Sequence, residues 1–251
     1  MPERQLVLVR HGESTYNASG RFTGLLDVPL STAGHRQAVQ AGQLIRHAGL
    51  TPTSVYTSLL ARAVDSADVI LDQIDSVDLA PTQRWELNER NYGELTGRLR
   101  SDVRQQYGEE RFFAWRRTVD GRPPALDKAD LRHPLTLFSN DPRIPLRALT
   151  GSESLRDVIG RVAEFLQEHL QPALVQGGCV VVVGHGNSLR ALSALINQLT
   201  DAEVEMLNVP TGQPLVYQLD QRGHPTGRGG RYLDPGAARR AGDVLAADGG
   251  T

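Results

Sequence analysis

The sequence has little cysteine, methionine or aromatic character: one Cys, two Met and 5% Phe, Trp and Tyr in 251 residues. A single cysteine excludes a disulfide within the chain, and we expect Cys179 to be a small buried residue that opens a strand. No apolar run approaches the roughly 18 residues that a membrane-spanning helix needs. The N-terminus lacks the layout of a signal peptide. These absences predict a cytoplasmic protein.

A strong charge of either sign is also missing. The 27 Lys and Arg residues nearly balance the 29 Asp and Glu residues, for a formal net charge of −2. This balance argues against a nucleic acid or an anionic membrane as the main partner. Any bound anion must therefore be held by a local group of arginines. The apolar share of 39% is ordinary for a globular protein, and the length suits one packed domain over residues 1–251.

Two continuous apolar runs, 6–9 and 179–183, are typical of strands buried on both faces of a sheet, and we place both at its centre. Apolar spacing predicts helices at 32–49, 60–74, 154–174 and 188–199, a short strand at 55–58, and a closing strand at 215–219 on an edge of the sheet. This alternation predicts an α/β fold of three layers, with a mostly parallel central sheet and helices on both faces.

Two segments do not fit a minimal sheet with its helices. Residues from about 92 to 150 are rich in Arg, Pro and Asp, which indicates an insertion folded over the core as a lid region. The tail, from about 224 to 251, is rich in Gly and Arg and then in Ala, and we expect it to be mobile. Its arginines and the helical character of 237–247 predict a second lid that closes over an anionic ligand.

Each predicted central strand ends in a His-Gly pair, at His11 and at His185. Ligands of open α/β sheets bind outside the carboxyl ends of the strands, so the two imidazoles should lie side by side in a site. The sequence has no Cys/His cluster, His-Glu-x-x-His motif, P-loop, nucleophile elbow or dinucleotide fingerprint. We therefore expect no metal site. What remains is histidine as a nucleophile, which attacks phosphorus well because a neutral imidazole has a free lone pair near its usual pKa of about 6.5.

A phosphoryl group that is transferred without a metal needs guanidinium groups and backbone N–H donors around its oxygens. Arg10 directly precedes His11, and Arg62 follows the predicted strand at 55–58. Gly186 and Asn187 open a helix, whose N-terminus favours an anion. These residues predict a phosphoryl-transfer site.

Several motifs together resemble the cofactor-dependent phosphoglycerate mutases of the histidine phosphatase superfamily. They are Leu8-Val-Arg-His-Gly-Glu-Ser14 with Asn17, Arg21-Phe-Thr-Gly24, Thr57-Ser58 with Arg62, Leu87-Asn-Glu-Arg-Asn-Tyr-Gly93, Trp115-Arg-Arg117, Gly184-His-Gly-Asn-Ser-Leu-Arg190 and Leu207-Asn-Val-Pro-Thr-Gly-Gln-Pro-Leu215. The Arg-His-Gly motif alone indicates the superfamily. The segments at 87–90, 116–117 and 208–212 indicate the mutase branch.

The resemblance implies that phosphorylated His11 gives its phosphoryl group to 3-phosphoglycerate. The resulting 2,3-bisphosphoglycerate, also the primer, returns its other phosphoryl group to His11 and leaves 2-phosphoglycerate. Glu89 is the implied general acid and base, while Arg10, Arg62 and His185 hold the phosphoryl group. These residues and a further set would bind the substrate: Ser14, Asn17, Thr23, Gly24, Arg90, Tyr92, Arg100, Arg116, Arg117, Gly186 and Asn187. A homodimer or homotetramer acting on small phosphoglycerates is implied as well.

The sequence departs from the family pattern at Arg100, where a lysine is usual, and at Asn91, where a histidine is usual. Asp65 departs too, and the stretch 131–151 matches poorly. These changes bear on affinity and turnover more than on the type of reaction.

Three alternatives use the same residues. Water as the acceptor would make the protein a phosphatase, although the insertion and the long tail exceed what a small phosphatase requires. A bisphosphoglycerate synthase would share the whole site. An inactive phosphate-binding module is disfavoured by the presence of both His11 and Glu89.

Overall fold

The computed structural model describes residues 4–76, 78–127, 130 and 141–247. Within these ranges one sheet contains six strands in the order β3-β2-β4-β1-β5-β6. The strands are β1 (Arg4–Arg10), β2 (Pro52–Thr57), β3 (Thr82–Gln83), β4 (Gly178–Gly184), β5 (Leu215–Gln218) and β6 (Arg231–Tyr232). The α-helices are α1 (Thr15–Ala18), α2 (Thr32–His47), α3 (Ala61–Gln73), α4 (Arg100–Tyr107), α5 (Glu109–Arg117), α6 (Leu155–Phe165), α7 (Gln171–Gln176), α8 (Gly186–Asn197), α9 (Asp201–Met206) and α10 (Pro235–Ala247).

The two apolar runs form β1 and β4, which lie next to each other at the centre of the sheet as predicted. They are parallel, with Leu8 opposite Val182. The β2 strand is parallel to β4 and β3 is parallel to β2, whereas β5 and β6 are antiparallel to their neighbours. The predicted α/β fold with a mostly parallel sheet is therefore confirmed.

The prediction that the strand at 215–219 lies on an edge of the sheet was wrong. β5 lies between β1 and β6, because Val216 pairs with Arg231 in the tail. A two-residue strand in a Gly- and Arg-rich segment has no alternation of apolar and polar residues that would reveal it.

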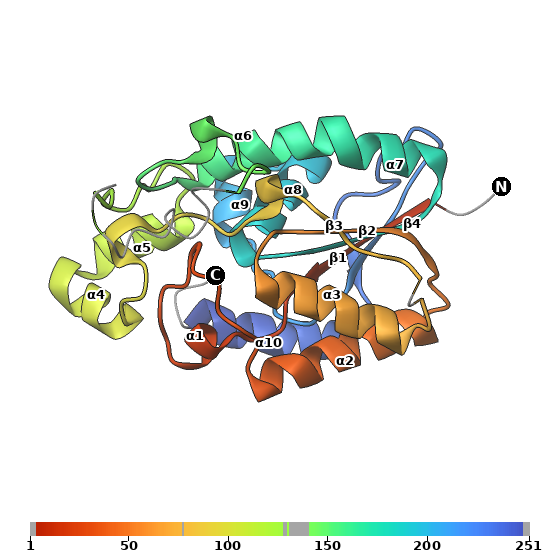
Figure 1. Ribbon diagram of the computed structural model, residues 1–251, viewed down its shortest axis with the longest axis horizontal. Helices are drawn as coiled ribbons and strands as arrows, with labels where there is room; N and C mark the ends of the chain where they lie inside the picture. Colours follow the sequence, from red (N-terminus) through yellow and green to blue (C-terminus); the bar gives the residue numbers. More distant parts are fainter. Residues whose placement is uncertain (1–3, 77, 128–129, 131–140, 248–251) are drawn as a thin grey trace.

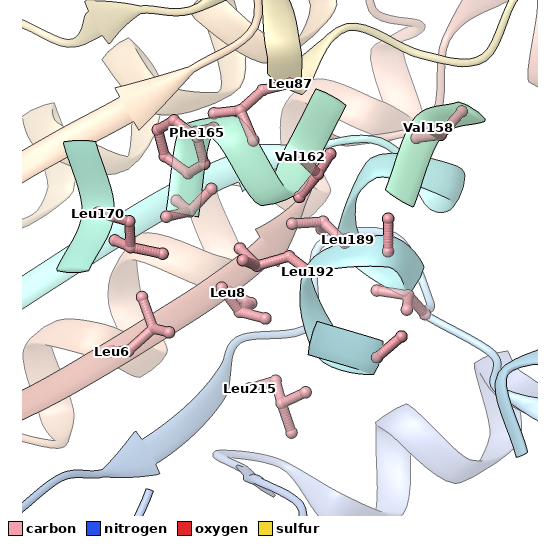
Figure 2. Close-up of a cluster of buried hydrophobic side chains, with 14 of the residues drawn as sticks. Leu6, Leu8, Leu87, Val158, Val162, Phe165, Leu170, Leu189, Leu192 and Leu215 are labelled. Atoms are coloured by element: carbon pink, nitrogen blue, oxygen red, sulfur yellow. The ribbon is translucent and has the colours of Figure 1, made fainter. Parts of the chain in front are cut away.

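Helices cover both faces of the sheet, with α6, α7 and α8 on one face and α2 and α3 on the other (Figure 1). Side chains alternate along a strand, so Leu6 and Leu8 of β1 pack under α6 and α8, whereas Val7 and Val9 pack under α2 and α3. Figure 2 shows the first of these clusters between the sheet and the helices. Each fully buried Leu or Phe in it contributes about 1.5–3 kcal/mol to folding.

The helix predicted at 154–174 is interrupted. α6 ends at Phe165, a π-helical turn covers Leu166–Leu170, and α7 follows. Pro172 lies in the first turn of α7 and lacks the N–H that an α-helical hydrogen bond to residue 168 would need. The axis nevertheless continues along one face of the sheet (Figure 1).

The insertion gathers beyond the carboxyl ends of β1 and β4, where α4 and α5 lie (Figure 1). Short 3₁₀ helices at Gly93–Leu95 and Leu146–Ala148 complete its described part. A small separate core of Phe22, Tyr92, Leu95, Val103 and Phe112 anchors it. Of the poorly matching stretch 131–151, residues 131–140 lie outside the described residues.

The tail forms β6 and α10 as far as residue 247, with Ala238 of α10 buried. Cys179 is buried in β4, as predicted. Across the described ranges, no helix has both the length and the apolar character that a membrane span requires.

Candidate active site

The two predicted histidines meet at the carboxyl ends of the central strands. Arg10 and Gly184 are the last residues of β1 and β4, and they lie opposite each other in the register of the two strands. The residue that follows each strand is a histidine. The ring centroids of His11 and His185 are 4.8 Å apart, with an angle of 62° between the ring planes. Both side chains are buried, and the backbone N–H of His11 donates to the carbonyl of Gly184 at 3.0 Å. The parallel sheet thus builds the imidazole pair from residues 174 positions apart.

A backbone contact orients the imidazole of His11. Its Nδ1 lies 2.6 Å from the carbonyl oxygen of Gly12. A carbonyl can only accept, so Nδ1 carries the proton, and Nε2 of the neutral ring keeps the lone pair that a nucleophile needs. Gly12 is required here because a Cβ would lie 2.1 Å from the carbonyl oxygen of Gly34. The glycine after His11 therefore lets α2 approach closely.

The surroundings of both imidazoles oppose their protonation. Burial, followed by the charges of Arg62 and Arg10, holds the pKa of His11 well below its usual value of 6.5. Burial and Arg62 also lower the pKa of His185. Both rings are consequently neutral at physiological pH, and His11 is available as a nucleophile.

Two buried arginines stand beside the imidazoles. Arg62, in the first turn of α3, donates to the carbonyls of Leu26 and Gly24 at 2.8 and 2.9 Å. Burial lowers its pKa to about 10, against the opposing effect of Glu89, so it stays cationic at neutral pH. Arg10 donates to the carbonyl of Val209 at 3.0 Å. Its Nε has no hydrogen-bond partner among the described residues.

Glu89 follows the 3₁₀ helix Trp85–Leu87 and is buried. Its Oε1 accepts from the backbone N–H of Arg90 at 2.7 Å and from the side-chain amide of Asn187 at 2.8 Å. The amide of Asn187 also donates to the hydroxyl of Tyr92 at 3.1 Å. The first turn of α8 therefore positions the carboxylate.

These groups surround a small pocket of about 30 Å³. Its lining is Arg10, His11, Asn17, Arg21, Phe22, Thr23, Gly24, Arg62, Glu89, Tyr92, Arg100 and Arg116. Five arginines and one carboxylate line it, so it suits a polyanion. A larger cavity of about 440 Å³ shares Arg10, Asn17 and Arg100 with the pocket and reaches α10.

Several predicted binding residues lie outside this lining. The hydroxyl of Ser14 caps α1 by accepting from the N–H of Asn17. Arg90 donates to the carbonyl of Trp115, and Arg117 donates to Asn208 at 3.0 Å. His185, Gly186 and Asn187 are also absent from the lining, although His185 contacts His11 and Asn187 contacts Glu89, which belong to it.

Other residues belong to the site although no role was predicted for them. Arg21 and Phe22 line the pocket, and their place in the motif 21–24 was the available signal. The hydroxyl of Ser58 lies 2.7 Å from Nε2 of His185. No local pattern predicts that contact, because it joins the end of β2 to the end of β4.

The described part of the chain contains no group of three or more His, Cys, Asp or Glu residues placed to hold a metal ion.

Comparisons with known proteins agree on one family. Residues 6–225 match the histidine phosphatase superfamily (branch 1). The chain is 44% identical over 245 residues to a protein of Corynebacterium jeikeium named 2,3-bisphosphoglycerate-dependent phosphoglycerate mutase, which covers 97% of this chain and 95% of that protein. A protein of the same name from Corynebacterium kroppenstedtii is 40% identical, with 99% of both chains covered.

Among solved structures, the alpha-ribazole phosphatase from Shigella flexneri aligns with a TM-score of 0.66 at 22% identity. The alignment covers 92% of this chain and 98% of that one. This likeness concerns the fold. The matches in sequence establish that the chain belongs to the histidine phosphatase superfamily.

Proposed function

We propose that this chain is a 2,3-bisphosphoglycerate-dependent phosphoglycerate mutase, a cytoplasmic enzyme of one domain that interconverts 3-phosphoglycerate and 2-phosphoglycerate. The observation that carries the proposal is the pairing of His11 with a carboxylate, Glu89, in one pocket whose other charges are arginines. A nucleophile for phosphorus, a proton carrier and several cations are what a transfer between two hydroxyl groups requires. The two Corynebacterium relatives bear the same name.

In the first half of the reaction, His11 is phosphorylated by 2,3-bisphosphoglycerate. Nε2 of His11 attacks phosphorus, the N–P bond forms, and the bond from phosphorus to the oxygen of the ligand breaks. The departing oxygen takes a proton from Glu89. In the second half, a hydroxyl of a monophosphoglycerate attacks the phosphohistidine and gives its proton back to Glu89, which leaves His11 free again. 3-Phosphoglycerate and 2-phosphoglycerate are interconverted when the hydroxyl that accepts the phosphoryl group is at a different position from the oxygen that released it.

Arg10 and Arg62 are proposed to hold the transferring phosphoryl group. Both line the pocket with His11, and an arginine stays protonated at neutral pH. His185 borders His11 and is proposed to stabilise the transition state as a hydrogen-bonding group.

The residues present fit a bisphosphorylated ligand. Nε of Arg10 and the hydroxyl of Thr23 are buried and have no hydrogen-bond partner within the described ranges. Such groups are costly to bury unless a ligand satisfies them. Arg21, Arg100 and Arg116 add three cations for a carboxylate and a second phosphate.

The decisive experiment is conversion of 3-phosphoglycerate with and without catalytic 2,3-bisphosphoglycerate, while inorganic phosphate is measured in parallel. Primer-dependent formation of 2-phosphoglycerate supports the proposal. Phosphate release without isomerisation would instead identify a phosphatase, which uses the same nucleophile with water as the acceptor. Accumulation of bisphosphoglycerate would identify a synthase. The proposal also includes a homodimer or homotetramer, which light scattering of the purified protein would test.

A further inference from the structure

Arg161 is a buried arginine on α6 that takes no part in the steps above. Its side chain is 7% exposed. The guanidinium binds the carboxylate of Glu153 with two hydrogen bonds, from Nε at 2.8 Å and from Nη2 at 3.1 Å. A buried ion pair by itself contributes little to stability, because desolvation offsets the attraction. Its remaining contacts therefore indicate what the pair does.

Those contacts all go to the backbone that carries Glu89. Nη1 of Arg161 donates to the carbonyl of Glu86 at 2.5 Å and to that of Asn88 at 2.8 Å. Nη2 donates to the carbonyl of Glu89 itself at 3.2 Å. One planar cation thus fixes three carbonyls, one in the 3₁₀ helix Trp85–Leu87 and two in the segment between it and the 3₁₀ helix Gly93–Leu95.

Glu153 binds the backbone of the same segment on the other side of Glu89. Its Oε2 accepts from the backbone N–H of Asn91 at 2.8 Å, and its own N–H donates to the carbonyl of Asn91 at 2.9 Å. The segment 86–91 is therefore bound on both sides of Glu89, by Arg161 of α6 and by Glu153 just before that helix. Asn187 then fixes the side chain of Glu89 from α8.

We propose that Arg161, together with Glu153, is a positioning residue that acts through Glu89. The clamp sets the backbone of segment 86–91 so that the carboxylate of Glu89 reaches the hydroxyl that gives or takes a phosphoryl group. A proton carrier displaced by about 1 Å can lose up to a hundredfold in rate. This inference rests on the proposed role of Glu89 as acid and base.

The test is a double-mutant cycle with Arg161→Met and Glu89→Gln, measured as mutase kcat and KM for 3-phosphoglycerate. Methionine has a similar length but donates no hydrogen bond. We expect Arg161→Met to lower kcat about tenfold to a hundredfold, with KM within about twofold, because the backbone of Glu89 is released. The double variant should be no slower than Glu89→Gln alone by more than about twofold, since the lost position matters only through the carboxylate.

Two further variants serve as controls for the cycle. Arg156→Met removes an exposed arginine of the same helix, which pairs with Asp120 and Asp201 at the surface, and should leave kcat unchanged. Arg161→Lys keeps the positive charge but lacks the planar guanidinium that donates hydrogen bonds in several fixed directions, so it should restore only part of kcat. If Arg161→Met does not fold, Glu153→Gln replaces it in the cycle with the same expectation.

If the loss of kcat in the double variant equals the product of the losses in the two single variants, the proposal is overturned, because Arg161 would then act independently of Glu89. Wild-type kcat in Arg161→Met would do the same. A Glu89→Gln single variant that runs at wild-type speed is a different result: it refutes the proposed role of Glu89, whatever Arg161 does.

Discussion

The side-chain amide of Asn187 donates to the carboxylate of Glu89, with 2.8 Å between Nδ2 and Oε1. The two residues lie 98 positions apart in the sequence. Asn187 belongs to the first turn of α8, which begins directly after His185. The contact therefore ties the proposed acid and base to the same strand end that carries one of the imidazoles.

Glu89→Gln keeps the size of the side chain and its ability to accept from Asn187, but it removes proton transfer. Turnover should fall about a hundredfold to ten-thousandfold, the usual contribution of general acid and base catalysis. Ligand binding, followed by calorimetry with 3-phosphoglycerate, should change little. Glu94→Gln, at an exposed position in the 3₁₀ helix that follows, serves as the control. Near wild-type turnover in Glu89→Gln would mean that another group carries the proton.

Brief treatment with labelled 2,3-bisphosphoglycerate should leave an acid-labile, base-stable phosphoryl group on His11. The reason is the lone pair that Nε2 keeps while Nδ1 donates to Gly12. His11→Ala should abolish both the label and the turnover, and peptide mapping of the labelled wild-type protein locates the site. Label that maps to His185, or that persists in His11→Ala, contradicts the assignment of the nucleophile.

The histidine pair should make folding stability depend on pH. Burial and nearby arginines lower the pKa of His11 and His185 in the folded protein, whereas both return to about 6.5 on unfolding. Below pH 6.5 the unfolded chain therefore binds more protons. The stabilisation is complete above about pH 6.5 and is lost as the pH falls, by up to about 1.4 kcal/mol per pH unit for each histidine.

Urea unfolding between about pH 7.5 and pH 5.5 measures this effect. The free energy of unfolding should fall across that range in the wild type and fall less steeply in His185→Gln. His47→Gln, at an exposed position of α2, should follow the wild type. Equal slopes for His185→Gln and the wild type would show that His185 is not held neutral by the fold.

Arg100 lines the pocket, at a position where the resemblance to the mutases led us to expect a lysine. Arg100→Ala removes one cation, and a hydrogen bond to a charged group contributes about 1.5–3 kcal/mol. We therefore expect KM for 3-phosphoglycerate to rise about tenfold to a hundredfold, with Arg100→Lys in between. Arg98→Ala is the matched control, because its guanidinium stands 5.6 Å from the ring of Tyr107, outside the pocket. A KM in Arg100→Ala equal to that of the control would exclude Arg100 from binding.

Truncation after Leu233 tests the tail as a lid. The cut keeps β6 and removes α10, whose residues Ala241, Val244 and Leu245 line the cavity that adjoins the pocket. We expect weaker mutase activity and a higher ratio of phosphate release to isomerisation, because water gains access to the phosphohistidine. Melting should change little, since most of α10 is exposed or half-buried. Truncation after Ala247 leaves α10 whole and is the control.

An unchanged ratio of phosphate release to isomerisation in the shorter protein would mean that α10 is not a lid. Protection from water would then come from the insertion, whose residues Tyr92 and Phe112 share a small core with Phe22.

The sequence by itself determined the centre of the sheet and the position of the histidine pair. Those features are local. A continuous apolar run such as 179–183, which is mostly valine, forms a strand buried on both faces wherever helices can cover it, and the His-Gly pair at its end follows from chain order alone. Parallel pairing of β1 with β4 then brings His11 and His185 together.

Only the tertiary structure decided which charged side chains face the pocket. Arg116 and Arg117 are neighbours at the end of α5, yet one lines the pocket and the other binds Asn208, because adjacent helical residues point about 100° apart. The role proposed for Arg161 could not be predicted from the sequence either. Apart from Glu153, its partners are backbone carbonyls up to 75 residues away, and a carbonyl is present at every position of a sequence. Residue type specifies what a guanidinium can bind, whereas packing alone specifies which acceptors come within reach.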